Sequence, residues 1–409
     1  MNNKTPRILI FSNNAASKTE SNGRIHMTHF LKFTDIHNFY IRGNPDVEGI
    51  NYLTLGNAGA VKTKLGWKAD KLITKSAGCN EQQNVPAASQ KTKKPIFHLL
   101  RNMAYTNNKS LLKFLNNYIK SHDINAIVLW GCNLPFLYEL SYKLSVFNSI
   151  PLFTITSEDY PLKTYNYISK KPSFFFRIFQ KSLRKWCLKV YKQSALNIYS
   201  NEELKNLYET QTKSLKSEVV FFGSDFVTAD LKINNSKKVI LYGGNLYRDR
   251  LESILELAKY LEKRDDVVIK LFGSVEKGLE SKVAELKNVV YGGLITYFDL
   301  LNEINRADFL LHVEGFSQKY ISDCKYAFST KIADYIMSGK PLIIYGPKEI
   351  SGIKFCLKFL KEFTITNKNE LNKIENILSG NHEISSLIRN MFSLEKVSSE
   401  IYSLFEKNI

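Results

Sequence analysis

The feature that most constrains the fold is the alternation of short, mainly apolar runs with longer helical patterns. Runs that are apolar throughout, rather than at every second position, are typical of strands buried on both faces, as in a parallel sheet. In the first half of the chain, these runs are RILIF (7–11), HNFYIR (37–42), AIVLW (126–130), PLFTIT (151–156) and LNIY (196–199). Helical patterns separate them near residues 24–33, 109–121, 135–147 and 173–192.

The same alternation occurs again in the second half. Its apolar runs are KVILY (238–242), VVIKLF (267–272), FLLHV (309–313), PLIIY (341–345) and EFTI (362–365). Its helical patterns lie near residues 249–262, 277–287, 297–305, 330–337, 369–378 and 384–407. Alternation that occurs twice predicts two doubly wound, Rossmann-like α/β domains, and 409 residues suffice for two domains.

The domain boundary is expected near VVFFGSDF (219–226), where Gly and Ser follow an apolar run. This places an N-terminal domain at 1–220 and a C-terminal domain at 221–385. A final helical segment, 386–409, can pack back toward the N-terminal domain. Residues 80–95 (NEQQNVPAASQKTKKP) contain almost no large apolar side chain, so we expect a mobile surface insertion there.

Cysteine usage and hydropathy exclude several classes of protein. The five cysteines are scattered and form no C-x-x-C pair, which argues against a disulfide framework and a structural zinc site. We expect neither a metal nor a cofactor. No stretch reaches the roughly 20 uncharged apolar residues that span a bilayer. The start, MNNKTPRILIF, is unlike a secretory signal, so a cytoplasmic location is expected.

Positive charge is concentrated in one acid-free stretch. The net charge is +18, and residues 160–201 contain no Asp or Glu. The cations of this stretch are Lys163, Lys170, Lys171, Arg177, Lys181, Arg184, Lys185, Lys189 and Lys192. Residues 174–192 read as an amphipathic helix with one basic side and one side formed by Phe175, Phe179, Leu183, Trp186 and Val190.

Such a helix suits the headgroup region of an anionic membrane. The alternative is a helix that packs on the core and leaves its charged side in solvent. Motifs typical of nucleic-acid recognition do not accompany the charge, so no nucleic-acid partner is expected.

Four strand-to-helix junctions in the second half carry residues suited to an anionic ligand. Ligands of doubly wound sheets bind beyond the carboxyl ends of the strands, where helix N-termini point their N–H groups. The first junction places Gly243, Gly244 and Asn245 before a helix that starts near Arg248 and Arg250. Glycines permit close backbone approach, and arginine binds phosphate well. A turn that binds nothing is the alternative.

The second junction is FSTKIADYIMSGKPLIIYG (328–346). Ser329 or Thr330 is expected to cap a helix that begins with Lys331 and carries Asp334 one turn later. A lysine at a helix N-terminus opposes the helix dipole unless an anion binds there. A capped helix with a solvent-exposed lysine is the alternative. The other two junctions are Gly273-Ser274 and Glu314-Gly315.

Three segments, in this order and spacing, resemble retaining family 4 (group 1) glycosyltransferases. They are EVVFFGSDF (218–226), ILYGGNLYRDRLESILELA (240–258) and STKIADYIMSGKPLIIYG (329–346). These enzymes have the GT-B architecture, in which two Rossmann-like domains face a central cleft. Over the first half of the chain the resemblance is only architectural, apart from SNGR (21–24), which is placed like the family's glycine-bearing acceptor loop.

The resemblance implies a hexosyltransferase of bacterial surface polysaccharide synthesis. Its donor would be a nucleotide-diphosphate sugar, and its acceptor a glycan or lipid-linked hydroxyl of lipopolysaccharide, capsule or exopolysaccharide. The protein would be peripheral on the inner face of the plasma membrane. An epimerase of the same architecture, acting on sugar nucleotides, and a non-catalytic lipid- or nucleic-acid-binding protein are the alternatives.

The resemblance also implies roles for individual residues. Gly244 and Arg250 would take the positions of the phosphate-binding glycine and lysine. Ser329, Thr330 and Lys331 would meet the diphosphate, and Asp334 the ribose. Arg248 would substitute for an arginine of the family at Asn245, and Glu314 for a glutamate at Tyr326. Acceptor contacts are expected from Asn22, Gly23 and Arg24, and Glu158 or Asp159 would be a base, a sugar contact or a helix cap.

Overall fold

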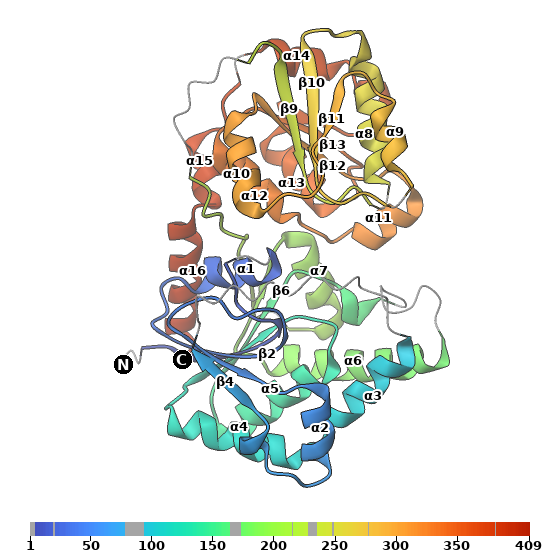
Figure 1. Cartoon of the computed structure of the whole chain (residues 1–409). Coiled ribbons are helices and arrows are strands. Elements are labelled where there is room, and N and C mark those ends of the chain that lie inside the picture. The colour runs from blue at the N-terminus through green and yellow to red at the C-terminus, as the bar shows by residue number, and fades with distance from the viewer. Residues whose placement is uncertain are drawn as a thin grey trace. The chain divides into compact units, whose positions relative to one another are not determined.

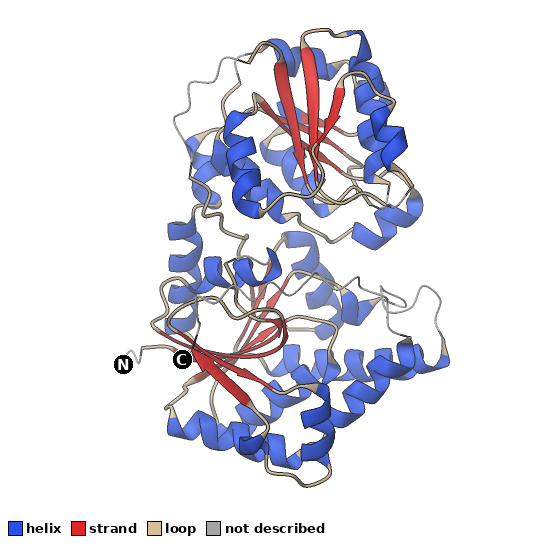
Figure 2. Cartoon of the chain, viewed as in Figure 1, coloured by secondary structure: helices blue, strands red, loops and turns tan. Residues whose placement is uncertain are grey.

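The computed structural model describes residues 5–18, 21–77, 94–163, 173–214, 216–227, 235–247, 249–276, 278–380 and 382–409. The chain forms two compact units. Unit 1 comprises Met1–Phe221 and Val397–Ile409, and unit 2 comprises Phe222–Lys396. Each unit contains its own sheet, with helices on both faces (Figures 1 and 2).

Unit 1 contains an eight-stranded sheet of order β4-β3-β2-β1-β5-β6-β7-β8. Neighbouring strands are parallel except β3 and β4, which are antiparallel. The strands are β1 (Arg7–Asn14), β2 (Asp35–Arg42), β3 (Ile50–Thr54), β4 (Thr74–Ala77), β5 (Ala126–Trp130), β6 (Leu152–Thr156), β7 (Leu196–Tyr199) and β8 (Ser217–Val219). The direction of winding reverses between β1 and β5, where a doubly wound sheet opens its ligand crevice.

The helices of unit 1 cover this sheet on both faces. They are α1 (Ser21–Phe30), α2 (Asn57–Lys64), α3 (Pro95–Tyr105), α4 (Lys109–Ser121), α5 (Pro135–Asn148), α6 (Phe174–Gln193), α7 (Glu202–Thr212) and most of α16 (Leu394–Glu406). The segment expected to be a mobile insertion lies almost wholly outside the described residues, and α3 begins where it ends, at Pro95.

The C-terminal helix belongs to the core of unit 1. Phe405 is fully buried, and its ring stacks on that of Phe153 in β6 with centroids 3.9 Å apart. The rings of Phe30 and Phe33 meet it edge-on. The sequence predicted one helix over 384–407, but the structure has two, α15 (Ser386–Met391) and α16. Between them the hydroxyl of Ser393 accepts a hydrogen bond from the Lys396 amide, which starts the second helix.

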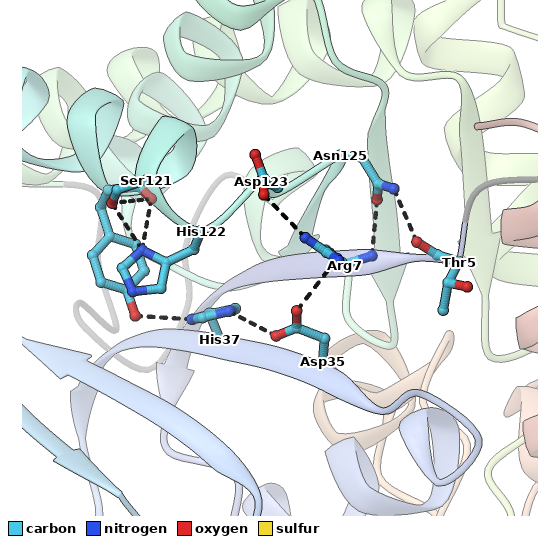
Figure 3. Close-up of polar contacts among 9 residues, drawn as sticks. Thr5, Arg7, Asp35, His37, Ser121, His122, Asp123 and Asn125 are labelled. Carbon is cyan, nitrogen blue, oxygen red and sulfur yellow. Dashed lines mark hydrogen bonds and ion pairs between the residues drawn. The ribbon is translucent and has the colours of Figure 1, made fainter.

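Ion pairs link residues at the amino-terminal edge of the unit 1 sheet (Figure 3). Arg7, which begins β1, lies 3.2 Å from the carboxylate of Asp123 and 3.7 Å from that of Asp35, which begins β2. The buried ring of His37 joins Asp35 at 2.9 Å to the hydroxyl of Tyr118 at 2.8 Å. Burial lowers the pKa of His37. These contacts fix the edge opposite the one at which ligands of such sheets bind.

Unit 2 contains a six-stranded, all-parallel sheet of order β11-β10-β9-β12-β13-β14. The strands are β9 (Lys238–Gly243), β10 (Val267–Phe272), β11 (Val289–Tyr291), β12 (Phe309–Val313), β13 (Leu342–Tyr345) and β14 (Thr364–Ile365). Counted within the unit, this is the Rossmann order 3-2-1-4-5-6. Its reversal point lies between β9 and β12.

The helices of unit 2 are mostly short. They are α8 (Arg250–Tyr260), α9 (Glu280–Ala284), α10 (Tyr297–Arg306), α11 (Gln318–Cys324), α12 (Thr330–Ser338), α13 (Ser351–Phe359), α14 (Lys373–Ser379) and α15. They lie on both faces of the sheet in Figure 2. The predicted class of two doubly wound, Rossmann-like domains is therefore confirmed.

The apolar side of α6 is not a membrane face, contrary to one prediction. Phe179, Leu183 and Val190 are buried in unit 1, and α6 packs against α3 and α5. Phe175, predicted on the same side, is instead exposed, and Trp186 is half-buried. The domain core occupies the side that was expected to face lipid, so only the outward side of α6 can meet a surface. Within the described ranges, no helix has the length and apolarity needed to cross a bilayer.

Candidate functional site

The candidate site lies at the carboxyl edge of the unit 2 sheet, where two glycine turns meet. Gly244 follows β9 with φ +149°, and Gly273 follows β10 with φ +136°. The Gly244 amide donates to the carbonyl of Phe272 at 2.7 Å. A Cβ atom on Gly273 would lie 1.8 Å from the Gly244 carbonyl oxygen, so the two backbones leave no room for a side chain. Glycine is required where backbones approach this closely at positive φ.

Lys331, the second residue of α12, reaches the first of these turns. A Cβ atom on Gly244 would lie 2.4 Å from its Nζ, so the ammonium group rests against the glycine. Nζ also donates to the Tyr242 hydroxyl at 3.4 Å and lies 4.4 Å from the centre of that ring. Burial, together with the charge of Arg250, lowers the pKa of Lys331 to about 7, although Glu314 acts in the opposite direction.

Arg250, the first residue of α8, is held by a buried carboxylate. Its Nε and Nη2 both donate to Glu314 Oε2, at 3.0 and 2.9 Å. Nη1 donates to no other group in the part of the chain that the structure describes. Glu314 follows β12, and Lys331 rests against Gly244, which follows the neighbouring strand β9, so the two cations lie at the ends of paired strands. The arrangement therefore places two cations and two helix N-termini at the reversal point of the sheet.

Glu314 is the buried anchor behind these cations. Burial would raise its pKa, but the Arg250 charge and hydrogen bonds outweigh burial and hold the pKa below its usual range. The Tyr320 hydroxyl also donates to Glu314, and His312 Nε2 lies 3.3 Å from Oε1. Burial lowers the pKa of His312. Glu314 therefore orients Arg250.

The N-terminus of α12 offers further polar groups. Ser329 occupies the N-cap position, as predicted, but its side chain makes no capping hydrogen bond. The hydroxyls of Ser329 and Thr330 have no partner among the described residues. Asp334 is buried, and its Oδ1 accepts a hydrogen bond from the Ser224 hydroxyl at 2.6 Å. Its role as a ribose contact stays a prediction.

The remaining donor-side prediction concerns the loop after Gly244. Asn245 is exposed, its carbonyl accepts from the Tyr242 hydroxyl at 2.8 Å, and its side chain accepts from the Tyr247 amide at 3.0 Å. Arg248 lies outside the described residues. Asn245 therefore shapes the loop, and the role of Arg248 stays a prediction.

The predicted acceptor residues lie in unit 1. Asn22, Gly23 and Arg24 fall in the first turn of α1, and the Asn22 side chain is outside the described part of the structure. A Cβ atom on Gly23 would lie 2.5 Å from the Ala15 carbonyl oxygen, which explains the glycine as a close approach of α1 to the loop after β1.

Glu158 and Asp159 follow β6 at the carboxyl edge of the same sheet. Asp159 is buried and forms an ion pair with Lys163 at 3.0 Å. It makes no capping hydrogen bond. The carbonyl of Glu158 accepts from the Tyr208 hydroxyl at 3.0 Å.

Several residues around the candidate site were not predicted. The Tyr242 ring makes a cation–π contact with Lys331, and the Tyr335 hydroxyl accepts a hydrogen bond from the Gly243 amide at 3.1 Å. The Tyr320 hydroxyl donates a hydrogen bond to Glu314, and the Ser224 hydroxyl donates one to Asp334. The described residues contain no group of three or more His, Cys, Asp or Glu side chains that could hold a metal ion. The cations and helix N-termini have the chemistry that suits an anion.

Comparison with known proteins establishes the fold. No protein-family model and no curated protein matches the sequence significantly. Sucrose-phosphate synthase from Thermosynechococcus elongatus matches with a TM-score of 0.61 and 10% identity over 98% of each chain. HepE from Anabaena, in complex with UDP, matches with a TM-score of 0.61 and 12% identity over 98% of this chain and 100% of its own. The UDP-forming α,α-trehalose-phosphate synthase from Burkholderia xenovorans, in complex with glucose-6-phosphate, matches with a TM-score of 0.58 and 10% identity over 98% of each chain. The chain thus has the fold of GT-B glycosyltransferases.

Proposed function

We propose that the protein is a glycosyltransferase that uses a nucleotide-diphosphate sugar. The observation that carries this proposal is a pair of cations at the reversal point of the unit 2 sheet, with Lys331 against Gly244 after β9 and Arg250 on Glu314 after β12. A diphosphate is the ligand that two neighbouring cations and two helix N-termini suit best. The fold supports the proposal, and UDP is the first nucleotide to test because HepE was solved with UDP.

In the proposed reaction the bond between the anomeric carbon and the diphosphate oxygen breaks. A bond from that carbon to the acceptor oxygen forms, and the acceptor hydroxyl loses its proton to a base. Negative charge develops on the departing diphosphate, and preorganised cations and helix N-termini stabilise such charge. Arg250, Lys331, Ser329 and Thr330 would contact the diphosphate, with Glu314 as the residue that positions Arg250.

The acceptor side is assigned to unit 1. The acceptor would be a hydroxyl of a glycan or lipid-linked glycan in bacterial surface polysaccharide synthesis, bound near residues 22–24. Glu158 or Asp159 would serve as base or sugar contact. The transfer would be that of a hexose with retention, as in the family that the sequence resembles. A cytoplasmic protein, peripheral on the inner face of the plasma membrane, would meet such an acceptor.

A nucleotide screen tests the donor site. UDP, GDP, CMP and dTDP are added to the purified protein, and the rise in melting temperature is measured, since a ligand that binds the folded state stabilises it. We expect one diphosphate to stabilise the protein, and Lys331→Met and Arg250→Ala to remove most of the shift. Lys263→Ala, an exposed lysine after the far end of α8, is the matched control and should keep the shift. Equal shifts in all variants would overturn the proposal.

Turnover separates a transferase from the epimerase alternative. An epimerase converts the sugar nucleotide without an acceptor and releases no free nucleotide. A transferase releases UDP in proportion to the acceptor glycosylated. The configuration of the new anomeric bond, measured by NMR, tests retention.

A further inference from the structure

The outward face of α3 is apolar. Phe97, Leu100 and Met103 are 55%, 53% and 57% exposed, and their spacing of three places them on one side of the helix. The opposite side of α3 packs into unit 1 through Asn102 and Tyr105, which are buried. A helix on a solvated surface ordinarily turns polar residues outward. The exposure of these apolar side chains to water is therefore unfavourable, and contact with an apolar partner would bury them.

The apolar surface extends onto α2. Val61 of α2 lines a groove of about 360 Å³ together with Phe97, Leu100 and Ala104 of α3, and its polar lining residues are Asn57, His98 and Arg101. Leu65 and Trp67, just after α2, are also largely exposed. Large contiguous apolar patches mark sites of contact with a membrane or another molecule.

The helices α2, α3 and α6 contain cations and no acidic residue. Residues 82–122 and 160–201 contain no Asp or Glu, so α3 and α6 are both acid-free, as is α2. The two helices pack together, with the His98 ring 6.1 Å from that of Phe179. The outward side of α6 begins with exposed Phe174, Phe175 and Ile178 and continues with the exposed Lys181, Lys185 and Lys189.

We propose that this surface inserts into an anionic phospholipid bilayer. The apolar faces of α3 and of the first turns of α6 would enter the acyl boundary, and the cations that follow on α6 would meet the headgroups. Apolar side chains flanked by lysines, with no carboxylate between them, are complementary to such a bilayer. This assigns membrane contact to α3 rather than to the buried side of α6.

A second copy of the chain is a poorer occupant. A two-fold dimer brings the same patch of each subunit together, so the α6 cations of one copy would approach those of the other. Like charges brought together at an interface oppose association. The inference does not depend on sugar transfer, because its residues lie in unit 1 and the proposed diphosphate site lies in unit 2.

Vesicle flotation with the full chain tests the inference. Vesicles of phosphatidylcholine with phosphatidylglycerol are compared with vesicles of phosphatidylcholine alone. We expect binding to the anionic vesicles, and a loss of about tenfold or more in partition coefficient for the triple variant Phe97→Ser, Leu100→Ser, Met103→Ser. The matched control changes three apolar residues of unit 2 that are as exposed, Val290→Ser, Leu294→Ser and Phe298→Ser, and should bind like wild type.

The depth to which α3 inserts into the bilayer is measured with a Phe97→Trp variant and lipids brominated on the acyl chain. Quenching of the added fluorescence, above that of the wild-type tryptophans, would show insertion, whereas binding without quenching would overturn it. Equal binding of the triple variant and the wild type would also overturn the proposal. So would a wild-type protein that binds no vesicles and forms a dimer that the triple variant does not form. Melting temperature and UDP-induced stabilisation, read on the same variants, report folding and the donor site separately.

Discussion

Lys331 couples the proposed donor site to pH. Its pKa of about 7 in the unliganded protein means that the ammonium form is lost as pH rises through neutrality. A bound diphosphate favours the charged form and raises the pKa, so binding takes up a proton above pH 7. We expect affinity for the diphosphate to fall with rising pH, by up to about tenfold per unit. Calorimetry in buffers of different ionisation enthalpy measures the proton uptake directly.

The control for this pH dependence is Lys331→Arg. Arginine stays charged throughout this range, so its remaining pH dependence is that of the nucleotide and of other groups. The difference between the two profiles is the contribution of Lys331. Parallel profiles from pH 6 to 9 would contradict a neutral lysine in the unliganded site.

Gly273 supports the site by letting two turns touch. Alanine at Gly273 would place its Cβ 1.8 Å from the Gly244 carbonyl oxygen, so the backbone beside Lys331 must move. Gly278→Ala is the matched control, because its φ is +91° but nothing lies within 4 Å of the added Cβ. We expect Gly278→Ala to cost about 1 kcal/mol of unfolding free energy and to spare nucleotide binding. Gly273→Ala should cost more and also weaken binding, as denaturation and titration would show.

Single residues show what the sequence can and cannot predict about the site. Gly244, Arg250 and Lys331 follow from the rule that ligands bind at the carboxyl ends of parallel strands, and the structure brings these three together. Tyr242 and Tyr320 carry no local signal, because an apolar strand end and a short helix accept tyrosine for packing alone. Tyr242 contacts Lys331 and Tyr320 lies beside Arg250, residues far apart in the chain that only the folded sheet brings together.

Among the elements, α16 is the one whose contribution to stability we test. Phe405 is fully buried against Phe153, Phe30 and Phe33. Phe405→Ala should lower the unfolding free energy of unit 1 by about 3–5 kcal/mol, as for other buried phenylalanines. Leu387→Ala in α15, where the side chain is 76% exposed, is the control and should change little. Urea unfolding measures both variants, and nucleotide binding in unit 2 should survive the first. Equal midpoints would contradict the packing of α16.

Several elements that the sequence did not predict have weak local signals. β11 spans only Val289–Tyr291, too short for a clear apolar run, whereas β8 (Ser217–Val219) overlaps the start of the strand expected in EVVFFGSDF. The edge strand β4 is the polar TKSA. The helix α3 was not predicted, although Phe97, Leu100 and Met103 recur on one side of it, because it directly follows the polar segment 80–95. The long buried runs of β1, β5, β9 and β12 were predicted correctly, since burial on both faces leaves an unbroken signal.

At the scale of the whole molecule, the chain separates its two proposed functions. Unit 2 is one continuous segment, 222–396, and the chain then returns to complete unit 1 with α16. The acid-free stretches 82–122 and 160–201 both lie in unit 1, whereas the diphosphate cations lie in unit 2. Under the two proposals, cations of unit 1 contact a membrane surface and cations of unit 2 contact a diphosphate.

Hydrogen exchange measured by mass spectrometry should distinguish the proposed diphosphate site from the proposed membrane surface in one protein. Ligands slow exchange where they stabilise local structure. UDP should protect the first turns of α8 and α12, and anionic vesicles should protect α3. The helix α16, buried and remote in sequence from both, is the internal reference and should respond to neither. Lys331→Met should remove the first pattern alone, and the triple serine variant of α3 the second alone. Protection of α3 by UDP, or of α12 by vesicles, would show that the two surfaces are energetically linked and contradict their independence.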